Sequence, residues 1–242
     1  MAFSSDDLYT GSGYLKKNPN WDDDFSEWKA GLVMELIEKN KIQFKTVVEV
    51  GCGAGGILRH LYSNYKQAVS WRGFDISGDA IRLAKEKEHG SIEFFHADYL
   101  AITTEQNAEL ILCIDVVEHI DHYYGFLQKL QSKSGQFIFH IPLDLSCRSL
   151  LKPHIMLQQR QTVGHLHYFS KEMVEWMLKE TGYEIVEWFY TKAEIDLEKP
   201  KGLKSFLKKY LRKFSFAINK NLSAHLWGGY SMMIYAKRNI GS

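Results

Sequence analysis

Residues 47–56 read VVEVGCGAGG, and this stretch decides the fold. Its β-branched first part is typical of a buried parallel strand, and the glycines that follow predict a tight turn. Ile57, Leu58 and Leu61 then recur at helical spacing. Because glycine has no Cβ, a ligand can approach the backbone N–H groups at the positive end of the helix dipole. We therefore expect a small ligand with an anionic or hydroxyl-rich part to bind at this turn.

The glycine turn alone leaves the class of ligand open. Gly51, Gly53 and Gly56 have the G-x-G-x-x-G spacing of dinucleotide sites, so a nicotinamide cofactor is not excluded. Other chemistry-bearing stretches follow the ends of later predicted strands, at Asp75, at residues 96–99 and at residues 114–120. The order of these later motifs must therefore decide whether the turn binds a dinucleotide or another ligand.

This order of motifs resembles that of class I S-adenosylmethionine-dependent methyltransferases, whose first motif has the form E/D-x-G-x-G-x-G. The residues that match it are Glu49, Gly51, Gly53 and Gly55, with Cys52 inside the turn. The resemblance covers about residues 47–190. It implies S-adenosyl-L-methionine as cofactor and an α/β, Rossmann-like fold. That fold has a seven-stranded mixed sheet of order 3-2-1-4-5-7-6, with the last strand antiparallel and helices on both faces.

Further cofactor contacts are expected after the second and third strands. Asp75 ends the predicted strand 70–75, and its two carboxylate oxygens can accept hydrogen bonds from a ribose diol. The alternative, a helix N-cap, is better filled by Ser77. Ile76 is expected to lie against the adenine. By resemblance, Asp98 accepts a hydrogen bond from the adenine amino group and Tyr99 covers the ring, although Asp98 can equally form a turn.

Asp115, Glu118 and His119 follow the fourth predicted strand, residues 108–115. Strands one and four flank the switch point of such sheets, so these side chains are expected beside the methyl donor. His119 can serve as a general base. The three residues can instead hold a divalent cation, as in ubiquinone-biosynthesis O-methyltransferases, where Glu stands in place of Asp115. In a third interpretation they only tie down the loop. We predict Asp115 as a cofactor contact and assign no metal.

Residues 164–169, GHLHYF, supply a second candidate base. They resemble the G-H-x-x-x-F-S stretch of methyltransferases that act on sugars or lipid precursors, in which the histidine faces the acceptor. That implies a substrate contact for His165, and less so for His167. His140, in a strand expected at residues 136–141 and stopped by Pro142, is interpreted as a packed strand residue. Residues 143–163 lack a clear period and lie where the family builds its acceptor pocket.

The domain organisation is expected to be one methyltransferase domain over residues 1–242. It comprises an N-terminal arm and lid helix (1–45), a cofactor-binding core (46–190) and a basic helical insertion (194–230) before the last strand. The lid helix is predicted at about residues 27–41, after an acid-rich start. Trp28 in its first turn either packs the helix onto the sheet or helps to cover the cofactor.

Composition places the chain among globular proteins. Its 242 residues are 45% hydrophobic, and no apolar run is long enough to span a bilayer. Cys52, Cys113 and Cys147 form no C-x-x-C pair, so neither a disulfide framework nor a zinc site is indicated. With no signal-peptide pattern at the N-terminus, a cytoplasmic location is expected.

Charge is uneven along the chain. From Lys199 to the end there are ten Lys or Arg residues and no Asp or Glu, although the net charge is only +1. Within this tail, residues 199–218 form a basic amphipathic helix with apolar positions from Leu203 to Ile218. Such a helix either lies peripherally on anionic lipid or packs its apolar side against the domain, which is the commoner arrangement. Nucleic acid is an unlikely partner because no basic patch with interleaved aromatic residues lies near the expected pocket.

The function predicted from these motifs is methyl transfer from S-adenosylmethionine to a hydroxyl oxygen. The acceptor class expected is a small molecule, a saccharide or an isoprenoid-linked precursor. His119 is the first candidate for the catalytic base and His165 the second. Two alternatives remain at this point: a Rossmann oxidoreductase that binds NAD, and a noncatalytic protein that binds S-adenosylmethionine.

Overall fold

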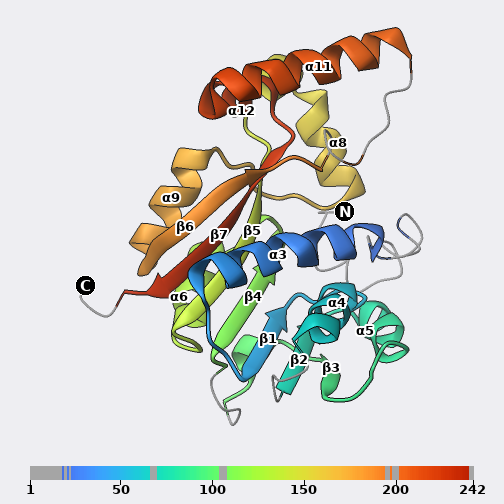
Figure 1. The fold of residues 1–242 in the computed structure, drawn as a ribbon, viewed down its shortest axis with the longest axis vertical. Helices are drawn as coiled ribbons and strands as arrows, with labels where there is room; N and C mark the ends of the chain where they lie inside the picture. Colours follow the sequence, from blue (N-terminus) through green and yellow to red (C-terminus); the bar gives the residue numbers. More distant parts are fainter. Residues whose placement is uncertain are drawn as a thin grey trace.

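Seven strands pair into one sheet, with the order β3-β2-β1-β4-β5-β7-β6. The computed structural model describes residues 18, 21, 23–65, 70–103, 108–193, 197 and 202–239. The strands are β1 (Thr46–Val50), β2 (Ser70–Asp75), β3 (Ile92–His96), β4 (Leu110–Ile114), β5 (Gln136–Leu143), β6 (Tyr183–Thr191) and β7 (Tyr230–Arg238). β7 runs antiparallel to both β5 and β6, whereas β1 to β5 pair in parallel. The predicted order and the antiparallel last strand are therefore confirmed (Figure 1).

Helices cover both faces of the sheet (Figure 1). One face packs against α3 (Ser26–Asn40), α4 (Gly56–Asn64) and α5 (Gly78–Lys85). The other packs against α6 (Tyr123–Gln131) and α9 (Lys171–Glu180). Three short 3-10 turns, η1 (Asp23–Phe25), η2 (Tyr99–Ala101) and η3 (Val117–His119), lie beside strand or helix ends. Most apolar strand residues are thus buried in one of two cores, one on each side of the sheet.

The helix expected at residues 27–41 is α3, and its amphipathic pattern explains its position. Ala30, Val33, Leu36 and Ile37 are buried against α4 and the sheet. The start of the helix is tied to the glycine turn, because Lys87 Nζ lies 2.7 Å from Asp23 Oδ2 and donates to the Ala54 carbonyl at 2.8 Å. The expected arm at residues 1–20 lies outside the described residues, apart from Asn18.

Some local predictions were wrong. β5 runs through Pro142 to Leu143 instead of stopping before it. The pairing of β5 with β4 ends at His140, so the missing N–H of Pro142 removes no hydrogen bond on that side. The region without a clear period, residues 143–163, contains α7 (Cys147–Leu151) and α8 (His154–Thr162).

The insertion between β6 and β7 contains α11 (Leu203–Ile218) and α12 (Lys220–Trp227). Both lie at the end of the molecule toward which β1, β4 and β5 point (Figure 1). The apolar side of α11 is exposed, with Leu203 83% and Ile218 71% accessible. The expectation that this side packs against the domain was therefore wrong. None of the described helices is both long and apolar enough to cross a bilayer.

Candidate active site

The glycine turn after β1 has the backbone that the sequence demands. Gly51, Gly53 and Gly55 have φ values of +69°, +53° and +76°, which other residues rarely adopt. A Cβ on Gly51 would lie 2.5 Å from a Val116 methyl, and one on Gly53 would lie 2.8 Å from the Trp21 indole. The turn therefore needs glycine both for its conformation and for the space above its backbone.

Asp75 lies against this turn at the end of β2. Its Oδ2 accepts the Gly53 N–H at 2.9 Å, and its Oδ1 accepts the Ser77 N–H at 2.8 Å. Ser77 caps α5 through the Ala80 N–H, as expected. Burial raises the pKa of Asp75, and the two backbone hydrogen bonds oppose that rise. The carboxylate is thus fixed in orientation, and Ile76 beside it is exposed to the pocket.

Asp98 and Tyr99 line the same pocket in different ways. Asp98 Oδ1 accepts the Leu100 N–H at 2.9 Å and caps η2, so the turn-forming role is present. Tyr99 is 1% exposed, and its ring lies 4.9 Å from that of Phe74. Tyr99 therefore forms a wall of the pocket, whereas Asp98 has its side chain at the surface.

Glu49 is a buried acid below the glycine turn. It is 1% exposed, and its Oε2 has no hydrogen-bond partner among the described residues. Burial raises its pKa well above the usual value, although the Lys29 charge opposes this. Cys52 is also buried, and burial raises the pKa of its thiol. Glu49 thus offers an acceptor oxygen that faces the pocket and that a ligand N–H or O–H can use.

Asp115 is the centre of a polar chain that joins α3 to the sheet. Its Oδ2 lies 2.7 Å from Lys29 Nζ, and its Oδ1 lies 2.5 Å from His140 Nδ1. His140 Nε2 is in turn 2.8 Å from Thr191 Oγ1. Asp115 has a φ of +55°, which strains a non-glycine residue and which the chain of contacts holds in place. Although burial opposes it, the charges of His140 and Lys29 hold the pKa of Asp115 well below its usual range.

His140 is buried in β5, as the sequence suggested, yet it also lines the pocket. Trp28 from the first turn of α3 meets its ring edge-on at 6.4 Å between centroids. The same contact therefore packs the lid helix onto the sheet and closes one side of the pocket.

Glu118, His119 and His165 come together although 46 positions separate the last two in the sequence. The Glu118 carbonyl accepts the N–H groups of Leu166 and His167, at 2.9 and 3.1 Å. His119 Nδ1 lies 3.1 Å from the Gly164 carbonyl, and the rings of His119 and His165 are 5.0 Å apart. These hydrogen bonds hold the GHLHYF stretch against η3, beside β4.

The second histidine of that stretch points elsewhere. His167 Nε2 lies 3.0 Å from the Ile120 carbonyl, and its ring packs on Tyr123 at 4.7 Å. His167 thus helps to hold this stretch in place, whereas His165 faces the pocket.

Asp144 is a site residue that the sequence analysis missed. Its Oδ2 lies 2.6 Å from His165 Nδ1, and its Oδ1 accepts a hydrogen bond from Gln159 Nε2 at 2.6 Å. Asp144 follows the last residue of β5, at the same edge of the sheet as Asp115 after β4. That position beyond a strand end was the signal that could have identified it.

The protonation states of the cluster differ. Burial, followed by the Asp115 charge, raises the pKa of Glu118 to about 8. Burial, followed by the His165 charge, lowers the pKa of His119 to about 4. Burial also opposes protonation of His165, but the hydrogen bond that it donates to Asp144 and the Glu118 charge outweigh burial and raise its pKa. His165 is therefore the more basic imidazole of the pair.

Ligand atoms of Glu118, His119 and His165 lie within 4.8 Å of one another, as a metal site requires. The cation set considered from the sequence included Asp115 instead of His165. The structure does not bring Asp115 into this group, because Lys29 and His140 occupy both of its oxygens.

One cavity of about 930 Å³ lies among these groups. It extends from the glycine turn and Asp75, past Asp115, to His119 and His165. Small-molecule pockets span about 300–1,000 Å³, so this one is at the upper end of that range. It has room for a cofactor at the glycine turn and a second molecule at the histidines.

Comparison with known proteins identifies the family. A family model described as a methyltransferase domain matches residues 21–188. The chain belongs to this methyltransferase family. The ubiquinone biosynthesis O-methyltransferase of Nitrosomonas europaea is 32% identical over 118 residues, which are 44% of this chain and 47% of that protein. The mitochondrial enzyme of the same name from Schizosaccharomyces pombe is 28% identical over 102 residues, 40% of this chain and 36% of that protein. The matches thus span less than half the length of these curated relatives.

Solved structures of methyltransferases share the fold. Magnesium protoporphyrin IX methyltransferase from Synechocystis PCC 6803, solved with bound SAH, has a TM-score of 0.64 at 14% identity and covers 96% of this chain and 97% of that one. The plantazolicin methyltransferase BpumL, solved with SAH, has a TM-score of 0.62 at 13% identity and covers 97% of this chain and 93% of that one. These likenesses concern the arrangement of strands and helices.

The residues of this methyltransferase fit S-adenosylmethionine, the cofactor of the family. The glycine turn and the fixed carboxylate of Asp75 line the pocket, and Glu49 has an orphaned buried oxygen there. Trp21, which the sequence analysis did not single out, lies over Gly53 and lines the pocket. These carboxylate oxygens are hydrogen-bond acceptors, so they suit a ligand with hydroxyl and ammonium groups.

Proposed function

We propose that this methyltransferase transfers a methyl group to a hydroxyl oxygen of a small-molecule acceptor. The observation that carries the proposal is the 2.6 Å contact between Asp144 and His165 at the far end of the cofactor pocket. A hydroxyl acceptor must lose its proton during methylation, and a carboxylate-backed imidazole is suited to take it.

The cofactor residues proposed are those that surround the glycine turn. When bound, S-adenosylmethionine supplies an electrophilic methyl group, so the protein has mainly to align the partners and exclude water. Asp75 holds the ribose, Glu49 accepts from the ammonium group, and the turn gives close approach to the backbone. Other proposed contacts are Gly51, Cys52, Gly53, Gly55, Ile76, Asp98, Tyr99 and Asp115. Lys29 and Asp115 keep the lid helix closed over them.

His165 is the proposed base, in a reversal of the order expected from the sequence. Its Nδ1–H donates to Asp144, which leaves Nε2 to accept the hydroxyl proton. The Asp144 carboxylate then stabilises the imidazolium that forms. His119 has a pKa of about 4, so it is a poor proton acceptor and serves to line and shape the acceptor site.

The acceptor class proposed is a saccharide or an isoprenoid-linked hydroxyl compound. The GHLHYF stretch supports it, as does the likeness to proteins named ubiquinone biosynthesis O-methyltransferase. A relative named (S)-tetrahydroprotoberberine N-methyltransferase, 26% identical over 104 residues, makes an amine the competing acceptor.

The test is methyl transfer from radiolabelled S-adenosylmethionine to matched phenol, sugar and amine acceptors. With a hydroxyl acceptor, we expect His165→Ala to lower kcat by about 10²–10⁴-fold, the range of general base catalysis. His119→Ala is expected to act mainly on KM. Asp144→Asn should lower kcat and shift the acid limb of its pH profile to lower pH, because the imidazole becomes less basic. Methylation of amines alone would contradict the proposal.

A chelator distinguishes general-base catalysis by His165 from catalysis by a cation bound at the same cluster. If His165 acts as a base, EDTA leaves the rate unchanged. Loss of activity with EDTA and its recovery on addition of Mg²⁺ or Zn²⁺ would instead assign Glu118, His119 and His165 to a metal.

A further inference from the structure

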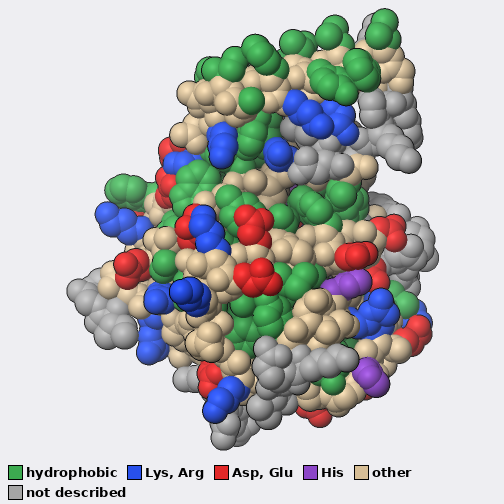
Figure 2. Space-filling model, in the orientation of Figure 1, with side chains coloured by type: hydrophobic (Ala, Val, Ile, Leu, Met, Phe, Trp, Pro, Cys, Tyr) green, Lys and Arg blue, Asp and Glu red, His purple; other side chains and the backbone are tan. Residues whose placement is uncertain are grey.

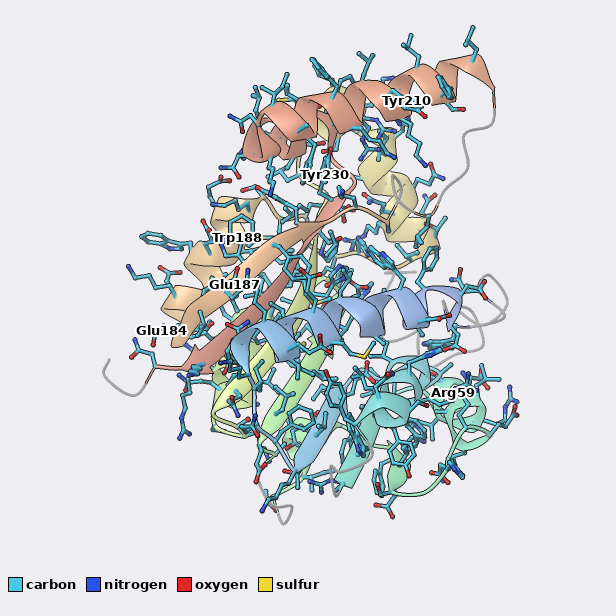
Figure 3. All side chains as sticks on the ribbon, in the orientation of Figure 1. Arg59, Glu184, Glu187, Trp188, Tyr210 and Tyr230 are labelled. Carbon is cyan, nitrogen blue, oxygen red and sulfur yellow. The ribbon has the colours of Figure 1, made fainter. Side chains whose placement is uncertain are left out.

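We propose that the outer side of α11, with the adjoining leucines of α12 and α7, docks this protein on an anionic phospholipid bilayer. The docking surface consists of Leu203, Leu207, Phe214 and Ile218 on α11 and Leu222 on α12, all of them exposed. Figure 2 shows hydrophobic side chains along the outer edge of α11, and Figure 3 shows side chains that project from the helix away from the sheet. The surface is separate from the cofactor pocket and does not depend on the function proposed above.

The polar side of α11, not its apolar side, faces the protein. Arg212 is 3% exposed, and its Nη2 donates to the Gly228 carbonyl at 2.6 Å. Its guanidinium lies over the Tyr230 ring, which is labelled beneath the helix in Figure 3. Ser215 Oγ contacts Ser223 Oγ at 2.9 Å. The inner side is thus fixed by specific hydrogen bonds and by Phe216, whose ring stacks on that of Tyr230 at 5.2 Å between centroids. This orientation leaves the stripe of leucines with Phe214 and Ile218 outside.

An exposed apolar stripe of this extent marks an interaction surface. Leu203, Leu207, Phe214 and Ile218 recur at four- and seven-residue spacing, so they form one side of the helix. Leu150 and Leu151 of α7, which packs against α12, add exposed apolar groups; Leu151 is 83% accessible. The apolar surface therefore extends over three helices.

Exposed lysines lie beside the stripe. Lys213 is next to Phe214 at one edge, whereas Lys208 and Lys209, four and three positions before the buried Arg212, share its inner side of the helix. Lys213 and Lys220 are exposed, and no Asp or Glu occurs in α11 or α12. A helix with an apolar side bordered by lysines is the arrangement that lies in the interface of an anionic membrane.

Charge also distinguishes between two possible binding partners of this surface, a second copy of the chain and a membrane. A second copy of the chain would present the same lysines, so an isologous contact would bring like charges together. A bilayer with anionic headgroups offers acyl chains for the leucines and negative charge for the lysines. We therefore assign the surface to an anionic membrane and not to self-association.

The test is co-sedimentation of the full chain with vesicles of phosphatidylcholine, alone or mixed with phosphatidylglycerol at roughly 7:3. We expect at least about tenfold stronger binding to the mixed vesicles and loss of that difference in high salt. Leu207→Gln/Phe214→Gln/Ile218→Gln should abolish binding, and Lys213→Glu/Lys220→Glu should weaken it about tenfold. All of these residues are exposed, so circular dichroism and titration with S-adenosylhomocysteine should remain unchanged.

Matched control variants carry the same changes elsewhere on the surface. Met173→Gln/Trp176→Gln/Val186→Gln removes exposed apolar groups of α9 and β6, and Lys85→Glu/Lys179→Glu reverses exposed lysines of α5 and α9. These variants should bind the mixed vesicles as the parent does. Equal binding by the α11 variants would overturn the proposal. So would absence of vesicle binding, including the case in which light scattering shows a dimer that the α11 triple variant dissolves.

Discussion

The glycine turn after β1 and the helix α11 both enclose ionisable side chains, where a protein interior ordinarily holds apolar ones. At the turn, positive-φ glycines let the side chains of Val116 and Trp21 pack closely on the backbone, and acids such as Glu49 are enclosed beneath it. In α11, Arg212 is enclosed while Phe214 and Ile218 are exposed. An ordinary domain would bury apolar side chains at both places and leave the ionisable ones in water. Both departures lower stability unless something outside the chain compensates, which is why both regions indicate a binding partner.

The first prediction disturbs the close packing at the turn. A Cβ on Gly51 meets Val116 and requires a strained φ of +69°, so Gly51→Val should abolish binding of S-adenosylhomocysteine. Calorimetric titration measures this. Gly31→Ala is the control, because a Cβ there contacts nothing and helical alanine stabilises by about 0.5–1 kcal/mol. Retained affinity in Gly51→Val would show that the turn is not the cofactor cradle.

The second prediction compares two neighbouring cations of α11. Arg212→Met leaves the Gly228 carbonyl without its buried donor and should lower the free energy of unfolding by about 2–3 kcal/mol. Lys213→Met changes an exposed residue and should alter it by less than about 0.5 kcal/mol. Urea unfolding distinguishes them. Equal effects would mean that the inner side of α11 is not where the structure has it.

The third prediction uses the pKa of Glu118. Because its folded pKa is raised from 4.5 to about 8, its contribution to stability is full below pH 4.5 and is lost as the pH rises to about 8. Glu118→Gln has no proton to lose, so its stability should fall less over this range than that of the parent. Urea unfolding at a series of pH values measures the difference. Parallel curves for the two proteins would place Glu118 in solvent.

The sheet and the cofactor turn could be predicted because local signals there agree with the fold. The β-branched run before Gly51 can only be a buried strand, and the carboxyl ends of parallel strands collect at one edge, which placed Asp75 and Asp115 together. The sequence could not show that Lys29 and His140 take both oxygens of Asp115, because those contacts join a helix and a strand far apart in the chain. Asp144 was missed for the same reason, since its partner His165 lies further along the chain, between α8 and α9.

The helix α11 shows where periodicity stops being informative. The spacing from Leu203 to Ile218 correctly predicts an amphipathic helix, but the pattern is the same whichever side faces the domain. The decision depends on Arg212, whose partners Gly228 and Tyr230 come after the helix and are matched to a guanidinium. Burial of an arginine at a place where leucines were available is a long-range property that no local window contains.

Calorimetric titration of the purified chain with S-adenosylhomocysteine, beside NAD and an Asp75→Ala variant, tests the central claim most directly. The account predicts saturable binding of S-adenosylhomocysteine, its loss in the variant, and no binding of NAD. The contrary result is a folded sample, freed of copurified ligand, that does not bind S-adenosylhomocysteine or that binds NAD in its place.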